Sequence, residues 1–250
     1  MIDIHSHIVY GVDDGSKSLE TSIAMVQMAA DAGTTDIVAS PHSNDEYEFK
    51  PDVIAARIAE IQGRVTGITI HTGCDFHLSY ENVEDCFANP TKYTINHLNY
   101  LLVEFPDGAL IPNIDQIFER MLGMNVIPIM THPERNWIIQ QSFDQFVSWV
   151  RLGALTQVTG GSLTGRFGKG AKQFAEKIIN AGLCHFIASD AHDTVDRHPR
   201  LTNAREIVRK NWGEDTAERF FVGNGHAVIT GGEIEPVETT TKKRKRWFFF

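Results

Sequence analysis

Seven short apolar runs, each ending in polar or turn residues, alternate along this chain with segments whose apolar residues recur at helical spacing. The runs span residues 2–4, 36–39, 68–71, 100–105, 126–130, 155–158 and 185–188. Helical spacing is clearest over residues 19–30, 54–65 and 114–122. This alternation is typical of repeated β-α units, in which parallel strands are buried beneath helices.

Seven such units, with no linker rich in proline or serine, predict a single α/β domain. We expect a closed or nearly closed, TIM-like parallel barrel of seven β-α units over residues 1–236, with an open doubly wound sheet as the alternative. Residues 237–250 form a separate C-terminal tail. In barrels of this class the active site lies at the C-terminal ends of the strands, so the residues after each run matter most.

Six of the seven runs end in, or are followed by, side chains that can bind a metal ion. These side chains are His5, His7, His42, Asp75, Glu104, His132, Asp190 and His192. His5 and His7 flank Ser6, so an extended backbone places both imidazoles on one face. The other six of the eleven histidines, including His77, are interpreted as structural or exposed.

Imidazole and carboxylate donors without thiolates favour manganese, zinc or iron, with magnesium less favoured. The donors exceed what one ion requires, so we expect two or three divalent ions. The cysteines Cys74, Cys86 and Cys184 are scattered, and none is followed by arginine six positions later. This pattern counts against a disulfide framework, a thiolate zinc site and a cysteine-dependent phosphatase loop. Each cysteine is expected to be a small buried hydrophobe.

The formal net charge of −9 is unevenly distributed. The tail contains Lys242, Lys243, Arg244, Lys245 and Arg246, followed by Trp247 and three phenylalanines. Because those five cations contribute to the total, residues 1–241 alone carry −14, which disfavours binding to nucleic acid. The tail is either a solvated end or an anchor to an anionic membrane surface.

The chain has no apolar run long enough for a membrane helix, and its start does not resemble a signal peptide. We therefore expect a cytoplasmic protein. If the tail binds lipid, the protein is peripheral to the inner face of the cell membrane.

Several motifs occur in a fixed order over residues 1–230. They are Ile2-Asp-Ile-His5-Ser-His7, Val12-Asp-Asp14-Gly15, Ser40-Pro-His42, Glu104-Phe105, His132-Pro-Glu-Arg135 and Ile187-Ala-Ser-Asp190-Ala-His192. Together they resemble the polymerase-and-histidinol-phosphatase (PHP) superfamily, and within it the bacterial tyrosine-protein phosphatases of capsule and exopolysaccharide loci. The resemblance implies a distorted barrel with a trinuclear site, often loaded with manganese. It also implies activity on phosphotyrosine of a membrane-bound autokinase.

The same resemblance implies roles for individual residues. By matching position, one ion is held by His5, His7, Glu104 and Asp190, and a neighbour by His42, Glu104 and His132. Asp75 and His192 complete the set, and Asp75 stands where the family pattern has glutamate. Arg135 and Arg197 match arginines that bind phosphate, and Asp14 matches a further carboxylate that lines the site.

The implied reaction is attack on phosphorus by hydroxide from a metal-bound water, while Arg135 neutralises the developing charge. A surface salt bridge with Glu134 is the alternative role for Arg135. A tyrosine leaving group has a pKa near ~10, so a dedicated acid is optional, although His192 or Asp14 could serve. Two alternative functions remain: a phosphatase of a small phosphomonoester such as histidinol phosphate, and a non-catalytic, metal-binding module that docks a kinase.

Overall fold

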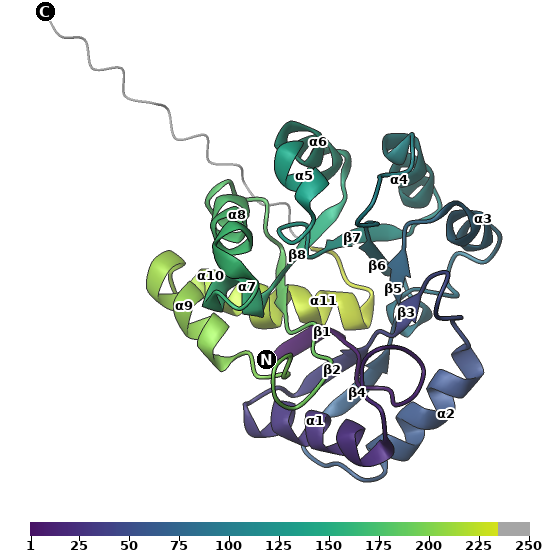
Figure 1. Cartoon of the computed structure of the whole chain (residues 1–250), viewed down its shortest axis with the longest axis vertical. Coiled ribbons are helices and arrows are strands. Elements are labelled where there is room, and N and C mark those ends of the chain that lie inside the picture. The colour runs from purple at the N-terminus through teal and green to yellow at the C-terminus, as the bar shows by residue number, and fades with distance from the viewer. Residues whose placement is uncertain (235–250) are drawn as a thin grey trace, which may run out of the picture.

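The computed structural model describes residues 1–234, in which parallel strands are surrounded by helices (Figure 1). The strands are β1 (Ile2–Ser6), β2 (Asp36–Ala39), β3 (His42–Ser43), β4 (Thr69–Thr72), β5 (Asp75–His77), β6 (Tyr100–Glu104), β7 (Ile127–Thr131), β8 (Leu155–Thr159) and β9 (Phe186–Ala188). Every predicted apolar run forms a strand, so the predicted α/β class is confirmed. The basic run and Trp247 lie outside the described residues.

The strands form two parallel sheets, with the orders β1-β2-β4 and β3-β5-β6-β7-β8-β9. Two segments of the chain contribute a strand to each sheet. The first contains β2 and β3, the second contains β4 and β5, and they pair as β2 with β4 in one sheet and β3 with β5 in the other. Pro41 lies between β2 and β3, where its missing N–H interrupts the ladder.

The seven-unit barrel is not confirmed, since the sheets do not close into one ring within residues 1–234. The edge strands β1 and β9 are joined near their ends by an isolated bridge between Ser6 and Ala191. The register of β1 shifts between Asp3 and Ser6, and Asp190 turns the chain after β9 with a φ of 51°. Both irregularities prevent a continuous ladder at this junction.

Most helices lie outside the strands, whereas α11 (Asn224–Thr230) packs against the inner apolar cluster (Figure 1). The other α-helices are α1 (Leu19–Asp31), α2 (Pro51–Gln62), α3 (Tyr80–Ala88), α4 (Ile114–Gly123), α5 (Trp137–Gln141), α6 (Phe143–Leu152), α7 (Gly160–Thr164), α8 (Gly168–Asn180), α9 (Thr202–Trp212) and α10 (Glu214–Glu218). Shorter turns occupy Ile95–His97 and Arg219–Gly223. Within residues 1–234, no helix combines the length and apolar character needed to cross a bilayer.

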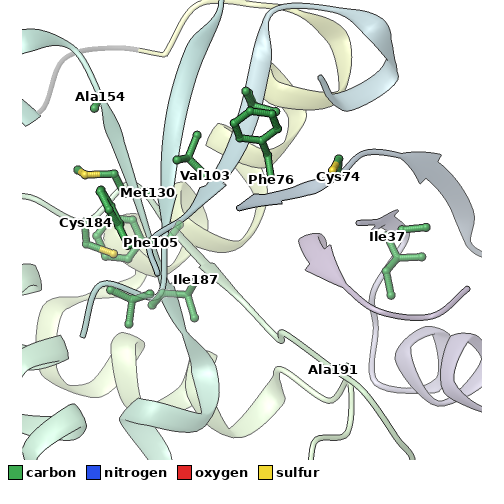
Figure 2. Close-up of a cluster of buried hydrophobic side chains, with 14 of the residues drawn as sticks. Ile37, Cys74, Phe76, Val103, Phe105, Met130, Ala154, Cys184, Ile187 and Ala191 are labelled. Carbon is green, nitrogen blue, oxygen red and sulfur yellow. The ribbon is translucent and has the colours of Figure 1, made fainter. Parts of the chain in front are cut away.

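Apolar side chains of β2, β6, β7, β8 and β9 are divided between an outer and an inner cluster. In β6, Leu101 and Val103 belong to the outer cluster beneath the helices, part of which is drawn in Figure 2. Tyr100 and Leu102 belong to an inner cluster that includes Val228 of α11. Because alternate residues share a face, the same pattern directs Glu104 inward at the C-terminal end of the strand. The alternation therefore places a carboxylate above an apolar inner layer.

The three cysteines are buried and free, as predicted. Cys74 and Cys184 lie within the outer cluster in Figure 2. Burial raises the pKa of Cys86 to about 11, and it raises the pKa of the Cys74 and Cys184 thiols as well. Thiols in such surroundings stay protonated and are poor nucleophiles.

Candidate metal centre

The predicted ligands meet at the C-terminal ends of the strands, where their donor atoms form overlapping groups. Donor atoms within each group lie within 4.8 Å of one another. The groups are His5, His7 and Asp75; His5, His132 and Asp190; His42, Asp75 and Glu104; and His7, Asp14, His42 and His192. All eight predicted ligands and Asp14 thus converge on one place, although they come from different parts of the chain.

Two of these residues have unusual backbone angles. His132 follows β7 with a φ of 34°, and Asp190 follows β9 with a φ of 51°. A left-handed conformation costs a non-glycine residue roughly 1–2 kcal/mol. Hydrogen bonds hold both turns, since His132 N–H donates to Gln157 O at 2.9 Å and Asp190 N–H donates to His5 O at 2.9 Å. The turns direct both side chains into the cluster.

The paired histidines of β1 are oriented by residues behind them. Nδ1 of His5 lies 2.9 Å from Oε1 of Gln157, and Nδ1 of His7 lies 2.8 Å from Oδ2 of Asp13. The Nε2 atoms therefore face the centre, where they lie 3.1 Å apart. Metal-binding histidines are commonly fixed in this way by a partner on the other nitrogen.

Sequence reasoning missed both of these partners. Asp13 stands beside Asp14 in a motif that was recognised, so the pair of carboxylates was an available signal. Gln157 lies inside the sixth apolar run, and no local pattern distinguishes it.

The buried carboxylates stay ionised because imidazoles surround them. Burial raises the pKa of Asp75, but His5 and His42 outweigh it and hold the pKa well below its usual value. Burial likewise raises the pKa of Asp190, and His5, His7 and Arg197 help to reverse this effect. Protonated imidazoles thus balance the carboxylates of this centre, and a bound cation would take the place of those protons.

Two potential metal-ligand atoms of the cluster have no hydrogen-bond partner among the described residues. They are Oδ2 of Asp75 and Nδ1 of His42, which are buried and lie 3.3 Å apart. Buried polar atoms are rarely left unpaired, and a cation would satisfy both. The residues present therefore fit divalent metal ions. The shorter side chain of Asp75 still reaches two of the groups.

Glu104 lies between two histidines. Its Oε2 is 3.4 Å from Nδ1 of His42, and its Oε1 is 3.6 Å from Nε2 of His132. Both histidines belong to the ion that the family resemblance assigned to His42, Glu104 and His132. The donor group that includes His5 and His7 contains Asp75 in place of Glu104, so the implied bridging role of Glu104 stays a prediction. His77, interpreted as structural or exposed, also lies here, with Nδ1 3.5 Å from Oε2 of Glu104.

Both predicted arginines contact Asp190. Nη2 of Arg197 donates to Oδ2 of Asp190 at 2.6 Å, and Arg135 forms an ion pair with the same oxygen. The guanidinium of Arg135 also lies 4.3 Å from the ring centroid of Phe167. The two guanidinium groups therefore converge on the edge of the metal cluster.

The alternative role of Arg135, a surface salt bridge with Glu134, is wrong. Glu134 is fully buried, and its Oε1 accepts hydrogen bonds from Thr159 N–H at 2.9 Å and from the Ser162 hydroxyl at 2.7 Å. Burial raises the pKa of Glu134 to about 7. This side chain faces the interior and supports the turn after β8.

Asp14 lies at the open side of the cluster. Its Oδ1 is 3.4 Å from Nε2 of both His42 and His192, and its side chain is 46% exposed. Hydrogen bonds from His192 and His42 hold the pKa of Asp14 below its usual value. Asp14 therefore presents an ionised carboxylate to solvent and to the cluster.

Comparison with known proteins gives one consistent result. Residues 1–230 match the family model described as capsular polysaccharide synthesis, CpsB/CapC. The chain is 34% identical over 257 residues to the putative tyrosine-protein phosphatase CapC of Staphylococcus aureus, covering 99% of both chains. It is 33% identical over 255 residues to the tyrosine-protein phosphatase YwqE of Bacillus subtilis, covering 100% of both.

Solved structures agree with this result. One matching structure has a TM-score of 0.88. It comes from a study of crystal structures of YwqE from B. subtilis and CpsB from Streptococcus pneumoniae, which are described as unique metal-dependent tyrosine phosphatases. That match has 30% sequence identity and covers 94% of this chain and 96% of the other. A Listeria monocytogenes lactonase, at 16% identity and a TM-score of 0.57, covers 93% of this chain and 95% of its own, and shares the fold alone.

Proposed function

The chain belongs to the CpsB/CapC family, and from this premise we propose that it is a metal-dependent phosphatase that hydrolyses phosphotyrosine in a protein. The observation that carries the proposal is the convergence of eight imidazole and carboxylate ligands with Arg135 and Arg197. The proposed substrate is a membrane-bound tyrosine autokinase that controls capsule or exopolysaccharide synthesis.

We assign the ions to the overlapping donor groups, with two or three ions per chain and manganese preferred over iron, zinc and magnesium. Divalent ions held by these groups would supply Lewis acidity and would activate water for attack on phosphorus. The protein's own contribution is the fixed orientation of His5 and His7 and the strained turns at His132 and Asp190.

Arg135 and Arg197 bind and orient the phosphate. Each guanidinium carries five N–H groups, and contact with Asp190 uses only part of this set. The remaining donors can hold the phosphate oxygens that gain charge in the transition state. Asp190 thus positions two cations beside the reacting group while its other oxygen faces His5 and His7.

Departure of the tyrosine needs little acid assistance, because the phenol has a pKa near ~10. Asp14 is ionised beside His42 and His192, so its Oδ1 accepts rather than donates a proton. The site therefore suits a phenolic leaving group better than the alkoxide of phosphoserine.

The test compares phosphate release from a phosphotyrosine peptide, a phosphoserine peptide and histidinol phosphate, with manganese and with a chelator. We expect activity on the phosphotyrosine peptide alone, lost on chelation and lost in His5→Ala. Preference for histidinol phosphate would establish the small-molecule alternative. Metal binding without turnover of any substrate would establish the non-catalytic docking module, and chelator-resistant activity would refute metal dependence.

A separate proposal concerns the C-terminal tail and where in the cell it holds the protein. We propose that residues 237–250 follow a catalytic domain of residues 1–236 and bind an anionic membrane surface through the basic run and Trp247. Deletion of residues 242–250 is expected to abolish sedimentation with anionic vesicles and to leave turnover of a small aryl phosphate unchanged. Vesicle binding that survives the deletion would refute this proposal.

A further inference from the structure

A pocket of about 240 Å³ adjoins the metal centre on the side of Arg197. It is lined by residues that follow β8 and β9, including Arg166, His198 and Arg200. Arg197 belongs to both places, because it lines the pocket while its Nη2 donates to Asp190. The pocket and the metal centre are therefore neighbours that share Arg197.

The pocket is strongly cationic. Arg166, Arg197 and Arg200 all line it, and the carboxylate nearest to Arg166 is that of Asp196, which is 90% exposed and 4.0 Å away. Asp193 lies in the same loop, but its Oδ1 accepts the backbone N–H groups of Val195, Asp196 and Arg197. Arg197 is paired with Asp190, so the weakly compensated charges of the pocket are those of Arg166 and Arg200.

Two further features agree with an anionic occupant. Nε of Arg197 is buried without a hydrogen-bond partner among the described residues. Helix α9 begins at the pocket wall, and Leu201 at its N-cap has no side-chain oxygen to cap the first N–H groups. His198, which lines the same pocket, has its pKa lowered by burial and by the nearby Arg166 and Arg200 guanidinium groups.

We propose that this pocket is a second anion-binding subsite, which receives a negatively charged group carried by a residue near the phosphotyrosine of the substrate. The proposal rests on the phosphotyrosine phosphatase function above and specifies its substrate class. The anionic group is either the carboxylate of an acidic residue or the phosphate of a second phosphotyrosine. Both are recognised by the same guanidinium chemistry.

The experiment compares three proteins: wild type, the double variant Arg166→Gln/Arg200→Gln, and the control Arg64→Gln. Arg64 is an exposed arginine after α2 and does not line the pocket. The reference substrate is a peptide with one phosphotyrosine and neutral flanks. A panel then places one glutamate at each position from four residues before the phosphotyrosine to four after it. A second panel replaces glutamate by a non-hydrolysable phosphonate analogue of phosphotyrosine.

We expect at least one position to lower the KM of wild type about fivefold at unchanged kcat, in line with a partly exposed charge-assisted contact. The double variant is expected to lose this gain and the control to retain it. All three proteins should hydrolyse a small aryl phosphate equally. A larger decrease in KM with the glutamate panel identifies a carboxylate as the ligand, and a larger decrease with the phosphonate panel identifies a phosphate.

A flat KM across both panels, or a gain that persists in the double variant, would overturn the subsite while leaving the phosphatase function intact. Failure of every phosphotyrosine peptide, including the neutral one, would overturn the proposed function and the subsite together. The two failures are therefore distinguishable.

Discussion

Nδ1 of His7 lies 2.8 Å from Oδ2 of Asp13, and both side chains are fully buried. The same oxygen accepts the backbone N–H of His42 at 3.1 Å, and Oδ1 accepts that of Gly15 at 2.9 Å. One carboxylate thus fixes an imidazole, the first loop and the start of β3. We regard Asp13 as the residue that holds this side of the metal centre in place.

Replacing Asp13 by asparagine should weaken metal binding. The amide carries no charge and can accept with only one oxygen, so His7 loses its ionic partner and one backbone contact is lost. Loss of such a supporting partner commonly lowers metal affinity about 10- to 100-fold. Titration of manganese into the metal-depleted protein measures this change, with Asp196→Asn as the exposed control. Equal affinity for wild type and Asp13→Asn would contradict the assigned role.

Gly15→Ala should disrupt the centre through contact with the backbone. A Cβ at this position would lie 2.3 Å from the carbonyl oxygen of His7 and 2.5 Å from its Cβ. Either the loop or β1 must move, at a cost of about 1–3 kcal/mol. The free energy of unfolding, measured with urea, and the turnover of an aryl phosphate should both decrease. Gly170→Ala is the matched control, because its Cβ would meet nothing within 4 Å. Full activity in Gly15→Ala would show that the loop is not tightly packed.

Arg135→Lys should lower kcat by ~100-fold, the size of effect seen when one transition-state donor is lost. Lysine keeps the charge but loses the planar fork and the stack on Phe167. Arg120→Lys is a matched control. Arg120 also stacks on an aromatic ring, with its guanidinium carbon 3.9 Å from the ring centroid of Phe87, but it is not part of the metal centre. Steady-state turnover of an aryl phosphate gives the result. An unchanged kcat in Arg135→Lys would show that charge alone suffices.

His185 should make the protein sensitive to acid. Burial, aided by Arg219, lowers its pKa from 6.5 to about 4, and its Nδ1 accepts the N–H of Thr156. Below pH 6.5 the unfolded chain binds a proton that the folded chain excludes, so the free energy of unfolding decreases from pH 6.5 toward 4. The loss amounts to about 3 kcal/mol at most.

His185→Asn keeps an acceptor for Thr156 but removes the titrating group. Urea unfolding between pH 7.5 and 4.5, in the same chelating buffer, should give a flatter pH dependence for this variant than for wild type. The exposed His226→Asn serves as control and should follow wild type. Parallel pH curves for wild type and His185→Asn would contradict the assignment.

The sequence predicted the strands well, because short apolar runs and helical periods are local signals. It did not predict the division into two sheets. That division depends on which strands pair beyond the breaks between β2 and β3 and between β4 and β5, a long-range property. The alternation within a strand, such as that from Tyr100 to Glu104, was predictable once the strand was known.

The convergence of the candidate metal ligands was also predictable, since parallel strands bring their C-terminal ends together. Their supporting contacts were not. His5 and Gln157 are 152 positions apart in the chain, and neither residue type identifies the other as a partner. The burial of Glu134 was missed for the same reason, because Thr159 and Ser162 donate to it from the turn after β8.

The apolar inner layer that includes Tyr100, Leu102 and Val228 has a consequence for the order of events during turnover. Because this layer closes the lower end of the space between the strands, we expect substrate and products to use the opposite end, where the exposed Asp14 lies. A phosphotyrosine that enters from that end would bring its phosphate in first, so we expect the dephosphorylated protein to leave before inorganic phosphate. Inorganic phosphate is then expected to compete with the next phosphotyrosine for the same position.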